Sequence, residues 1–222
     1  MKYAEYEVAF SPARLNKYLV ACGWNKAKAL KLYRNNIMLC KAIYGILNVF
    51  EVVLRNAINE HYKTYFDDKN WIRNQLQPGG MLESHPQCAA TIKTIADLEN
   101  KGLYTNDRVV SSVTFGFWTY LFTKRPYQSG GKSLLRIFPD KEKGLGQRAI
   151  YNELQAVKSF RNRIAHYEAI CFDSMGSKST STVRDNYAII VKYIQFLGFS
   201  ESSLFYGLDV IPHKLLNKID LL

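Results

Sequence analysis

The stretch "CKAIYGILNVFEVVLRNAINEHYKTYF", residues 40–66, constrains the fold more than any other part of the chain. Its apolar residues recur at steps of three and four: Ile43, Ile46, Leu47, Phe50, Leu54, Ala57 and Ile58. This spacing predicts a long amphipathic α-helix, because it places these side chains on one helical face. The preceding segment, "NKAKALKLYRNNIMLCKAIY", leads into that helix, and one helical stretch shared by both is an open alternative.

Helical signals also dominate the rest of the chain. In "SPARLNKYLVACGW", Ser11 fits an N-cap, Pro12 fits the first helical position, and Gly23 is expected to end the helix. The segment "VVSSVTFGFWTYLFTK" fits a strand or a buried helix, and its helical neighbours favour helix. Further helices are expected in "CAATIKTIADLENKG", closed by Gly102, and in "QRAIYNELQAVKSFRNRIAHYEAI" and "YAIIVKYIQFLG".

The predicted loops complete the fold class. Pro and Gly predict loops in "QLQPGGMLESHPQ" and "KRPYQSGGKS". The polar, Ser-rich residues 172–186 are expected to form a flexible loop, and residues 187–222 to form C-terminal helices. Together these signals predict an all-α, bundle-like single domain over residues 1–222.

The charge balance favours an anionic partner. Lys and Arg outnumber Asp and Glu by 30 to 19, giving a net charge of +11, and nucleic acid is preferred over a membrane surface. We expect no apolar run of about 18 residues that could span a bilayer, and the N-terminus has no signal-peptide pattern. The four cysteines and four histidines are scattered without a CxxC pair, so no metal and no cofactor is expected. The chain is therefore expected to be cytoplasmic, with reduced thiols.

The segment "QSGGKS" resembles the end of a Walker A loop at Gly131, Lys132 and Ser133. That motif needs a glycine five residues before Gly131, where Pro126 stands, and it needs a preceding strand, for which there is no convincing signal. A basic surface loop is the favoured interpretation.

The segment "SFRNRIAHYEAI", residues 159–170, sets Arg161, Arg163 and His166 into an apolar helical pattern. Asn162 and His166 are i, i+4 neighbours, and Arg163 and His166 can meet at i, i+3. Arg161 and His166 differ by about 140° around an ideal helix. They would therefore border a groove without touching, unless the helix is distorted or a second subunit contributes.

These residue types suit the cleavage of RNA without a metal ion. A histidine can remove the proton of a 2′-hydroxyl because its ordinary pKa lies near neutrality. An arginine can stabilise the phosphorane because its planar fork matches phosphate oxygens. The spacing alone is a weak signal, since Arg55 and His61 satisfy the same window. A surface face of a structural helix is the alternative.

Glu51 and Arg55 are an i, i+4 pair on the long helix. A carboxylate at the edge of the apolar stripe needs a cation or a backbone donor, because an unpaired buried charge is costly. A salt bridge that specifies packing is favoured on this segment alone, over a polar network beneath a catalytic site.

Three blocks, read in order, resemble one protein family. They are "LYRNNIMLCKAIYGILNVFEVVLRNAI", "VVSSVTFGFWTYLF" and "SFRNRIAHYEAI", which lie within residues 32–170. They resemble the Abi-like proteins of the AbiD/AbiF group, bacterial abortive-infection factors of the HEPN superfamily. The middle block has Thr114 where the family pattern has Ser.

The resemblance implies an all-α HEPN-like bundle with additional helices, whose R-N-x-x-x-H signature matches Arg161, Asn162 and His166. Active members are metal-independent endoribonucleases with a composite site across a homodimer. Glu51, together with Arg55 and Asn56 of the "LRN" block, then has a supporting role in orienting the site, as does Arg163.

These expectations give a leading function and two alternatives. The first is an endoribonuclease of phage defence, held in check by an antitoxin-type partner or a small RNA. The second is a non-catalytic RNA-binding module of a ribonucleoprotein, and the third is a protein interaction component. RNA contacts are expected, more weakly, from Lys124, Arg125, Lys132, Arg136, Lys141 and Lys143.

Overall fold

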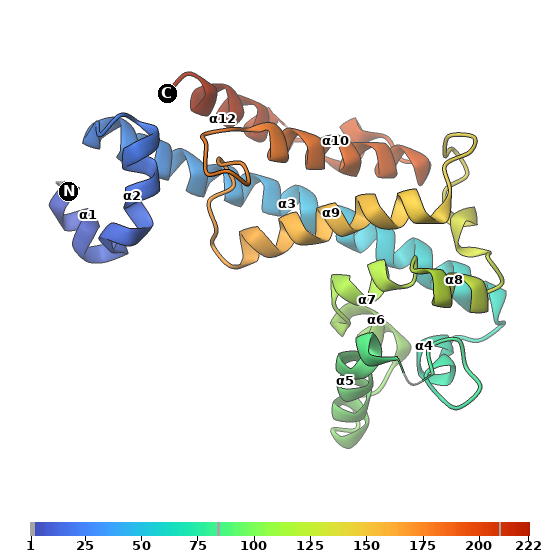
Figure 1. Ribbon diagram of the computed structural model, residues 1–222. Coiled ribbons are helices and arrows are strands. Elements are labelled where there is room, and N and C mark those ends of the chain that lie inside the picture. The colour runs from blue at the N-terminus through green and yellow to red at the C-terminus, as the bar shows by residue number, and fades with distance from the viewer. Residues whose placement is uncertain (1–2, 84, 209) are drawn as a thin grey trace. The chain divides into compact units, whose positions relative to one another are not determined.

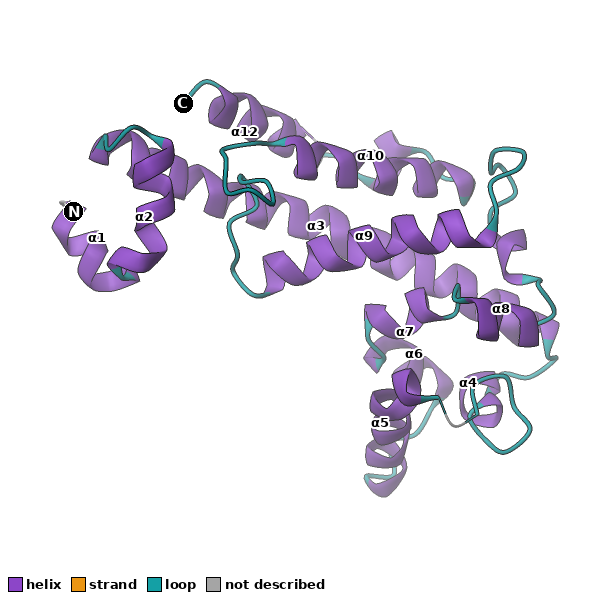
Figure 2. Cartoon of the chain, viewed as in Figure 1, coloured by secondary structure: helices purple, strands orange, loops and turns teal. Residues whose placement is uncertain are grey.

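The structure is a computed structural model that describes residues 3–83, 85–208 and 210–222. Within these ranges there is no β-strand, only an isolated bridge between Phe172 and Lys178 (Figures 1 and 2). The predicted all-α class is therefore confirmed. The helices are α1 Tyr3–Phe10, α2 Pro12–Ala21, α3 Lys26–Tyr65, α4 Trp71–Gln75, α5 Ala89–Asn100, α6 Asn106–Ser112, α7 Phe115–Tyr120, α8 Lys124–Ser129, α9 Gln147–Ala165, α10 Ser181–Phe196, α11 Glu201–Leu204 and α12 Val210–Asp220, with short 3-10 turns η1 Pro86–Cys88 and η2 Leu134–Ile137.

The predicted long helix is one continuous helix of 40 residues, α3, which includes the preceding segment. Its apolar face is inaccessible to solvent along most of its length, because side chains three or four positions apart share that face. Each of the following is at most 1% exposed: Leu32, Leu39, Ile43, Ile46, Phe50, Leu54 and Ile58.

The expectation that no segment could span a bilayer is wrong for α3 on length and composition. Among the residues that the structure describes, α3 is the one helix that passes this test. This is weak evidence for a membrane span, since the core helix of a soluble protein passes the same test. In the 18-residue window of α3 that passes it, 33% of the residues are buried.

The chain divides into two compact units, each built from separate segments. Unit 1 contains Met1–Val49, Phe160–Ile190 and Glu201–Leu222, and unit 2 contains Phe50–Ser159 and Val191–Ser200. Three helices, α3, α9 and α10, therefore contribute residues to both units.

Unit 1 packs its C-terminal helices against each other. The first half of α10 lies beside α12 (Figure 1), where Arg184 forms a 2.7 Å ion pair with Asp220. The rings of Tyr187 and His213 meet edge to face at 5.1 Å. The predicted N-cap of α2 is confirmed, since the Ser11 hydroxyl accepts the N–H of Arg14.

Unit 2 has an aromatic core. The rings of Tyr62 and Trp71 lie 4.9 Å apart, and Phe138 meets Tyr193 edge to face at 5.3 Å. Glu153 binds both Lys192 and the Tyr193 hydroxyl at the edge of this core. Because Trp71 and Trp118 are both fully buried, this unit has a substantial apolar interior.

Two predictions in unit 2 need correction. The helix expected over residues 109–124 is right in type but is broken into α6 and α7, because Val113 and Thr114 are extended. The loop expected in "KRPYQSGGKS" begins with the short helix α8. Pro126 is compatible with it because it lies in the first helical turn, where its missing N–H has no partner to lose.

Two predictions in unit 1 are also corrected. The helix expected to reach Ile170 ends at Ala165. The flexible loop expected over residues 172–186 ends earlier, because α10 begins at Ser181. The remaining loop is hydrogen-bonded, since the Asp173 carboxylate accepts the N–H groups of Met175 and Ser177. C-terminal helices are present as expected.

Candidate functional site

The candidate site lies where α9 ends, in unit 1. The N–H of Tyr167 donates to the carbonyl of Ile164 at 3.0 Å, and the N–H of Glu168 donates to that of Arg163 at 2.9 Å. This is the hydrogen-bond pattern of a Schellman motif, in which the residue after the cap is left-handed. Tyr167 occupies that position with φ 58°, and His166 is the cap residue. His166 therefore stands at the end of α9, at the boundary between the helix and the segment that follows.

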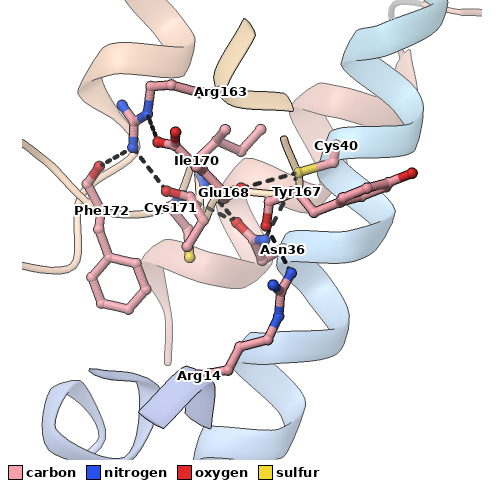
Figure 3. Close-up of polar contacts among 10 residues, drawn as sticks. Arg14, Asn36, Cys40, Arg163, Tyr167, Glu168, Ile170, Cys171 and Phe172 are labelled. Atoms are coloured by element: carbon pink, nitrogen blue, oxygen red, sulfur yellow. Dashed lines mark hydrogen bonds and ion pairs between the residues drawn. The ribbon is translucent and has the colours of Figure 1, made fainter. Parts of the chain in front are cut away.

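Arg163 fixes the segment that follows. It forms a 3.3 Å ion pair with Glu168 and donates to the carbonyl oxygens of Ala169 and Phe172, at 2.8 and 3.4 Å (Figure 3). Its guanidinium is therefore occupied with shaping the chain after His166. The i, i+3 spacing would allow Arg163 to contact His166. The contacts described for Arg163 at this helix end go instead to Glu168, Ala169 and Phe172.

Asn36 holds the same segment from α3. It is only 4% exposed, and its side-chain oxygen accepts the N–H groups of Ile170 and Cys171, at 2.9 and 3.2 Å (Figure 3). The sequence pattern did not single out Asn36 as a site residue. The available signal was an amide at helical spacing within the buried stripe, four residues after Leu32 and seven before Ile43.

Arg14, on α2, is the third residue that holds the segment after α9. Its guanidinium donates to the carbonyl oxygen of Tyr167 at 2.7 Å (Figure 3). Tyr167 itself is 76% exposed. The left-handed backbone of a non-glycine residue carries strain. Arg14 and the Schellman bonds together hold it there.

His166 lines a small hollow of about 170 Å³, and the side chain is exposed to solvent. The other lining residues are Arg14, Lys17, Tyr18, Tyr167, Glu168 and Ala169. Two cations thus stand beside the histidine, one of them 2.7 Å from the neighbouring carbonyl. The sequence pattern pointed to neither Arg14 nor Lys17.

The Lys17 ammonium lies over the rings of Tyr18 and Phe172, at 5.7 and 5.6 Å from their centroids. Although the residue as a whole is exposed, this partial desolvation lowers the pKa of Lys17, and the positive charges of Arg14 and Arg163 lower it further. Cys171 and Glu168 act in the opposite direction. Burial is the largest of these effects, so the lowered pKa of Lys17 reflects mainly the apolar and aromatic surroundings of its ammonium group.

A larger groove of about 860 Å³ adjoins this hollow, and the two share Arg14 and Tyr167. Its wall is mainly apolar and comes from α1, α3 and the end of α9. Several large apolar side chains in it are partly exposed, namely Phe10, Ile37, Tyr44 and Tyr167. Lys41 adds a second cation to the groove.

The residues that sequence analysis selected occupy different places. Arg161 is half-buried and Asn162 is exposed, both in the last turns of α9. Within the described chain, the residues lining the hollow of His166 include neither of them. The carbonyl of Asn162 accepts the N–H of His166 at 2.9 Å.

The supporting residues on α3 belong to unit 2. Glu51 and Arg55 are half-buried there, and Asn56 is exposed. The Nε atom of Arg55 is buried without a hydrogen-bond partner in the described structure.

Of the six basic residues expected to contact RNA, Lys141 is half-buried and the other five are exposed: Lys124, Arg125, Lys132, Arg136 and Lys143. The "QSGGKS" segment begins in the last turn of α8. The hydroxyl of its buried Ser133 donates to the carbonyl of Gly130 and is hydrogen-bonded to His61. Tyr65 packs so tightly against Gly131 that an added Cβ would meet its hydroxyl at 2.0 Å. These contacts give the glycine and the serine structural roles.

Burial raises the pKa of the Cys40 thiol to about 11 and that of Cys171 to about 12, so both thiols are protonated at neutral pH. All four cysteines are free. In the part of the chain that the structure describes, no group of three or more His, Cys, Asp or Glu side chains could hold a metal ion.

Comparison with protein-family models, with curated proteins and with solved structures finds no match for this chain.

Proposed function

We propose that the chain is a metal-independent endoribonuclease of the Abi-like, HEPN type, with His166 as its proton-transfer group. The observation that carries this proposal is the hollow in which exposed His166 stands beside Arg14 and Lys17. A titratable imidazole next to two cations is the arrangement that general acid–base cleavage of a phosphodiester needs. The net charge of +11 supplies attraction for RNA.

In this mechanism, His166 removes the proton of the 2′-hydroxyl, which then attacks the adjacent phosphorus. The phosphorane carries extra negative charge, and the cations of Arg14 and Lys17 stabilise it. The bond to the 5′-oxygen breaks, and protonated imidazole returns a proton to that leaving group. The products are a 2′,3′-cyclic phosphate, or its opened form, and a 5′-hydroxyl.

The adjoining groove suits the bases that flank the cleaved bond. Bases of a single strand stack on exposed aromatic rings in a sequence-tolerant way. Tyr44 and Tyr167 provide such rings, and Lys41 and Arg14 provide charges for the backbone. Single-stranded RNA is therefore the substrate class that this surface favours.

Arg161 and Asn162 retain the roles that the resemblance implies, phosphate stabilisation and positioning. Because neither lines the hollow of His166 within one chain, their participation needs a second copy of the protein. A cytoplasmic homodimer with a composite site, acting in phage defence under the control of an inhibitory protein or a small RNA, is the corresponding biological proposal.

A second candidate function is a non-catalytic RNA-binding module. The observation that favours it is the structural use of the motif, since Arg163 holds the loop after α9 and His166 is a helix cap. It needs the same basic surface but no proton transfer.

One experiment distinguishes the two proposed functions. Labelled single-stranded RNA is incubated with the protein in EDTA, and the product ends are identified. We expect cleavage by the wild type and by His213→Ala, a control at another exposed histidine of unit 1, and loss of at least about 100-fold in His166→Ala. Cleavage that persists in His166→Ala contradicts the mechanism, and binding without cleavage in the wild type supports the second function.

The composite site has a separate test. Sedimentation at micromolar concentration is expected to give a dimer, and mixing Arg161→Ala with His166→Ala should restore part of the cleavage. A monomer with full activity contradicts the composite site.

A further inference from the structure

Unit 2 contains a polar pocket of about 330 Å³ that the proposed ribonuclease mechanism does not use. It is formed by α7, α8, α9 and the turn at η1. Its lining residues are His85, Gln87, Gly116, Tyr120, Thr123, Lys124, Arg125, Tyr151, Gln155 and Lys158. The volume falls in the range of pockets that hold small organic ligands.

The pocket is strongly positive. Lys124, Arg125 and Lys158 line it, and none of the described lining residues is a carboxylate. The hydrogen bonds seen for two of these cations go to neutral oxygens. Lys158 donates to the Gln155 side chain at 3.3 Å, and Arg125 donates to the backbone carbonyl of Glu83 at 3.4 Å. The positive charge is therefore not neutralised within the pocket, which favours an anionic ligand.

Tyr120 supplies an independent indication of a ligand. The residue is only 4% exposed, and its hydroxyl is buried without a hydrogen-bond partner in the described structure. A buried hydroxyl is normally paired, because leaving it unpaired costs free energy. Burial raises the pKa of Tyr120 to about 12, so this hydroxyl carries a proton at neutral pH and can donate it to an oxygen.

One wall of the pocket is aromatic. The rings of His85 and Tyr120 lie 4.4 Å apart with an interplanar angle of 34°. The Nδ1 atom of His85 accepts the N–H of Gln87, so a neutral His85 carries its proton on Nε2 and offers a further donor. Tyr151 adds a third ring. Flat aromatic surfaces beside cations suit a ligand that joins a phosphate to a planar base.

We propose that this pocket binds the phosphate monoester of a nucleotide. Lys124, Arg125 and Lys158 neutralise the phosphate, and Tyr120 donates to one of its oxygens. A monoester is favoured over a diester because it carries up to two negative charges near neutral pH and three oxygens that accept hydrogen bonds. The same chemistry is offered by a free nucleoside 5′-monophosphate and by the 5′-phosphate end of an RNA strand.

Binding is tested on the full-length protein by calorimetry and by thermal unfolding. The probes are inorganic phosphate, each of the four nucleoside 5′-monophosphates, and a short RNA with either a 5′-phosphate or a 5′-hydroxyl end. We expect at least one nucleotide probe to bind more tightly than inorganic phosphate, and Lys158→Ala to weaken that binding about tenfold. Lys93→Ala, at an exposed lysine of α5 outside the pocket, serves as the matched control and should change nothing.

The variant Tyr120→Phe tests whether the Tyr120 hydroxyl binds the ligand or is simply unpaired. Removing an unpaired buried hydroxyl does not destabilise the unliganded protein, so its melting temperature should be unchanged or higher. The nucleotide-induced rise in melting temperature should nevertheless shrink. If no probe binds, or if Lys158→Ala and Tyr120→Phe both bind nucleotide like the wild type, the proposal is overturned.

The RNA probes identify the source of the phosphate. Tighter binding of the 5′-phosphate RNA than of its 5′-hydroxyl counterpart assigns the pocket to an RNA end. Equal binding of the two RNAs, with mononucleotide binding that Lys158→Ala weakens, assigns it to a free nucleotide. His166→Ala should retain nucleotide binding, so loss of RNA cleavage and loss of this site are measured separately.

Discussion

The guanidinium of Arg14 lies 2.7 Å from the carbonyl oxygen of Tyr167, across 153 positions of sequence. This hydrogen bond joins the first turn of α2 to the cap that follows α9. It holds a strained, exposed tyrosine in place and leaves a cation beside His166. Arg14 thus both stabilises the backbone of the candidate site and contributes a positive charge to it.

Replacing Arg14 should therefore affect stability and RNA binding together. Arg14→Ala is expected to lower the free energy of unfolding by about 1 kcal/mol, because one exposed hydrogen bond is lost. On the proposed function, the slope of log affinity for RNA against log salt concentration should fall by about one. Arg14→Lys retains the charge and should retain the slope, so an equal slope for wild type and Arg14→Ala would place Arg14 outside the RNA contact.

Two substitutions at Tyr167 distinguish the effect of backbone strain on stability from the effect of the aromatic ring on RNA binding. Tyr167→Gly should be more stable than Tyr167→Ala by about 1 kcal/mol, since glycine adopts φ 58° without strain. Both variants lose the ring, so both should bind single-stranded RNA about tenfold more weakly if the ring stacks on a base. Urea unfolding and filter binding measure the two effects, and unchanged RNA affinity in both variants would remove Tyr167 from the binding surface.

Asn36 is expected to be among the most sensitive polar positions of unit 1. Asn36→Ala removes the acceptor of the Ile170 and Cys171 N–H groups and should cost about 3 kcal/mol, because both become unpaired where they are buried. Asn217→Ala, at an exposed position of α12, should stay within about 0.5 kcal/mol of the wild type. Urea unfolding measures both, and similar stability of the two variants contradicts the role of Asn36.

The buried thiol of Cys171 is expected to make the folded state less stable at high pH. Burial raises the pKa of its thiol in the folded state from the ordinary value of 9.0 to about 12. The folded state thus keeps a proton that the unfolded state releases, so stability is complete below pH 9 and falls as pH rises toward 12. By about pH 10.5 the wild type should lose about 2 kcal/mol more than Cys171→Ala does, relative to pH 8.

The comparison of these two proteins removes the effects of the buried tyrosines, which both proteins share. Unfolding by urea at each pH gives the free energies. Parallel pH profiles for the wild type and Cys171→Ala would show that Cys171 is not the group responsible.

Several elements could be predicted because their signals are local. The apolar residues of α3 repeat at helical spacing, and Ser11 and Pro12 form a capping pattern that depends on neighbours within three residues. For α9, the apolar pattern continues through Ile170 and predicts an end that is too late, because the hydrogen bonds of Arg163 and Asn36 hold the chain in a turn after Ala165. Asn36 lies on another helix, and Arg163, although it lies in α9, is not one of the apolar residues whose spacing predicts the helix.

By itself, the sequence determined the all-α class and the long helix, because periodicity and capping are read within a few turns of chain. Only the tertiary structure decided that Arg14 and Lys17 stand beside His166, and that Lys158 meets Lys124 and Arg125 in a second pocket. The physical reason is that a hollow is made by side chains from distant segments. Their proximity depends on how the buried faces pack, which no local pattern encodes.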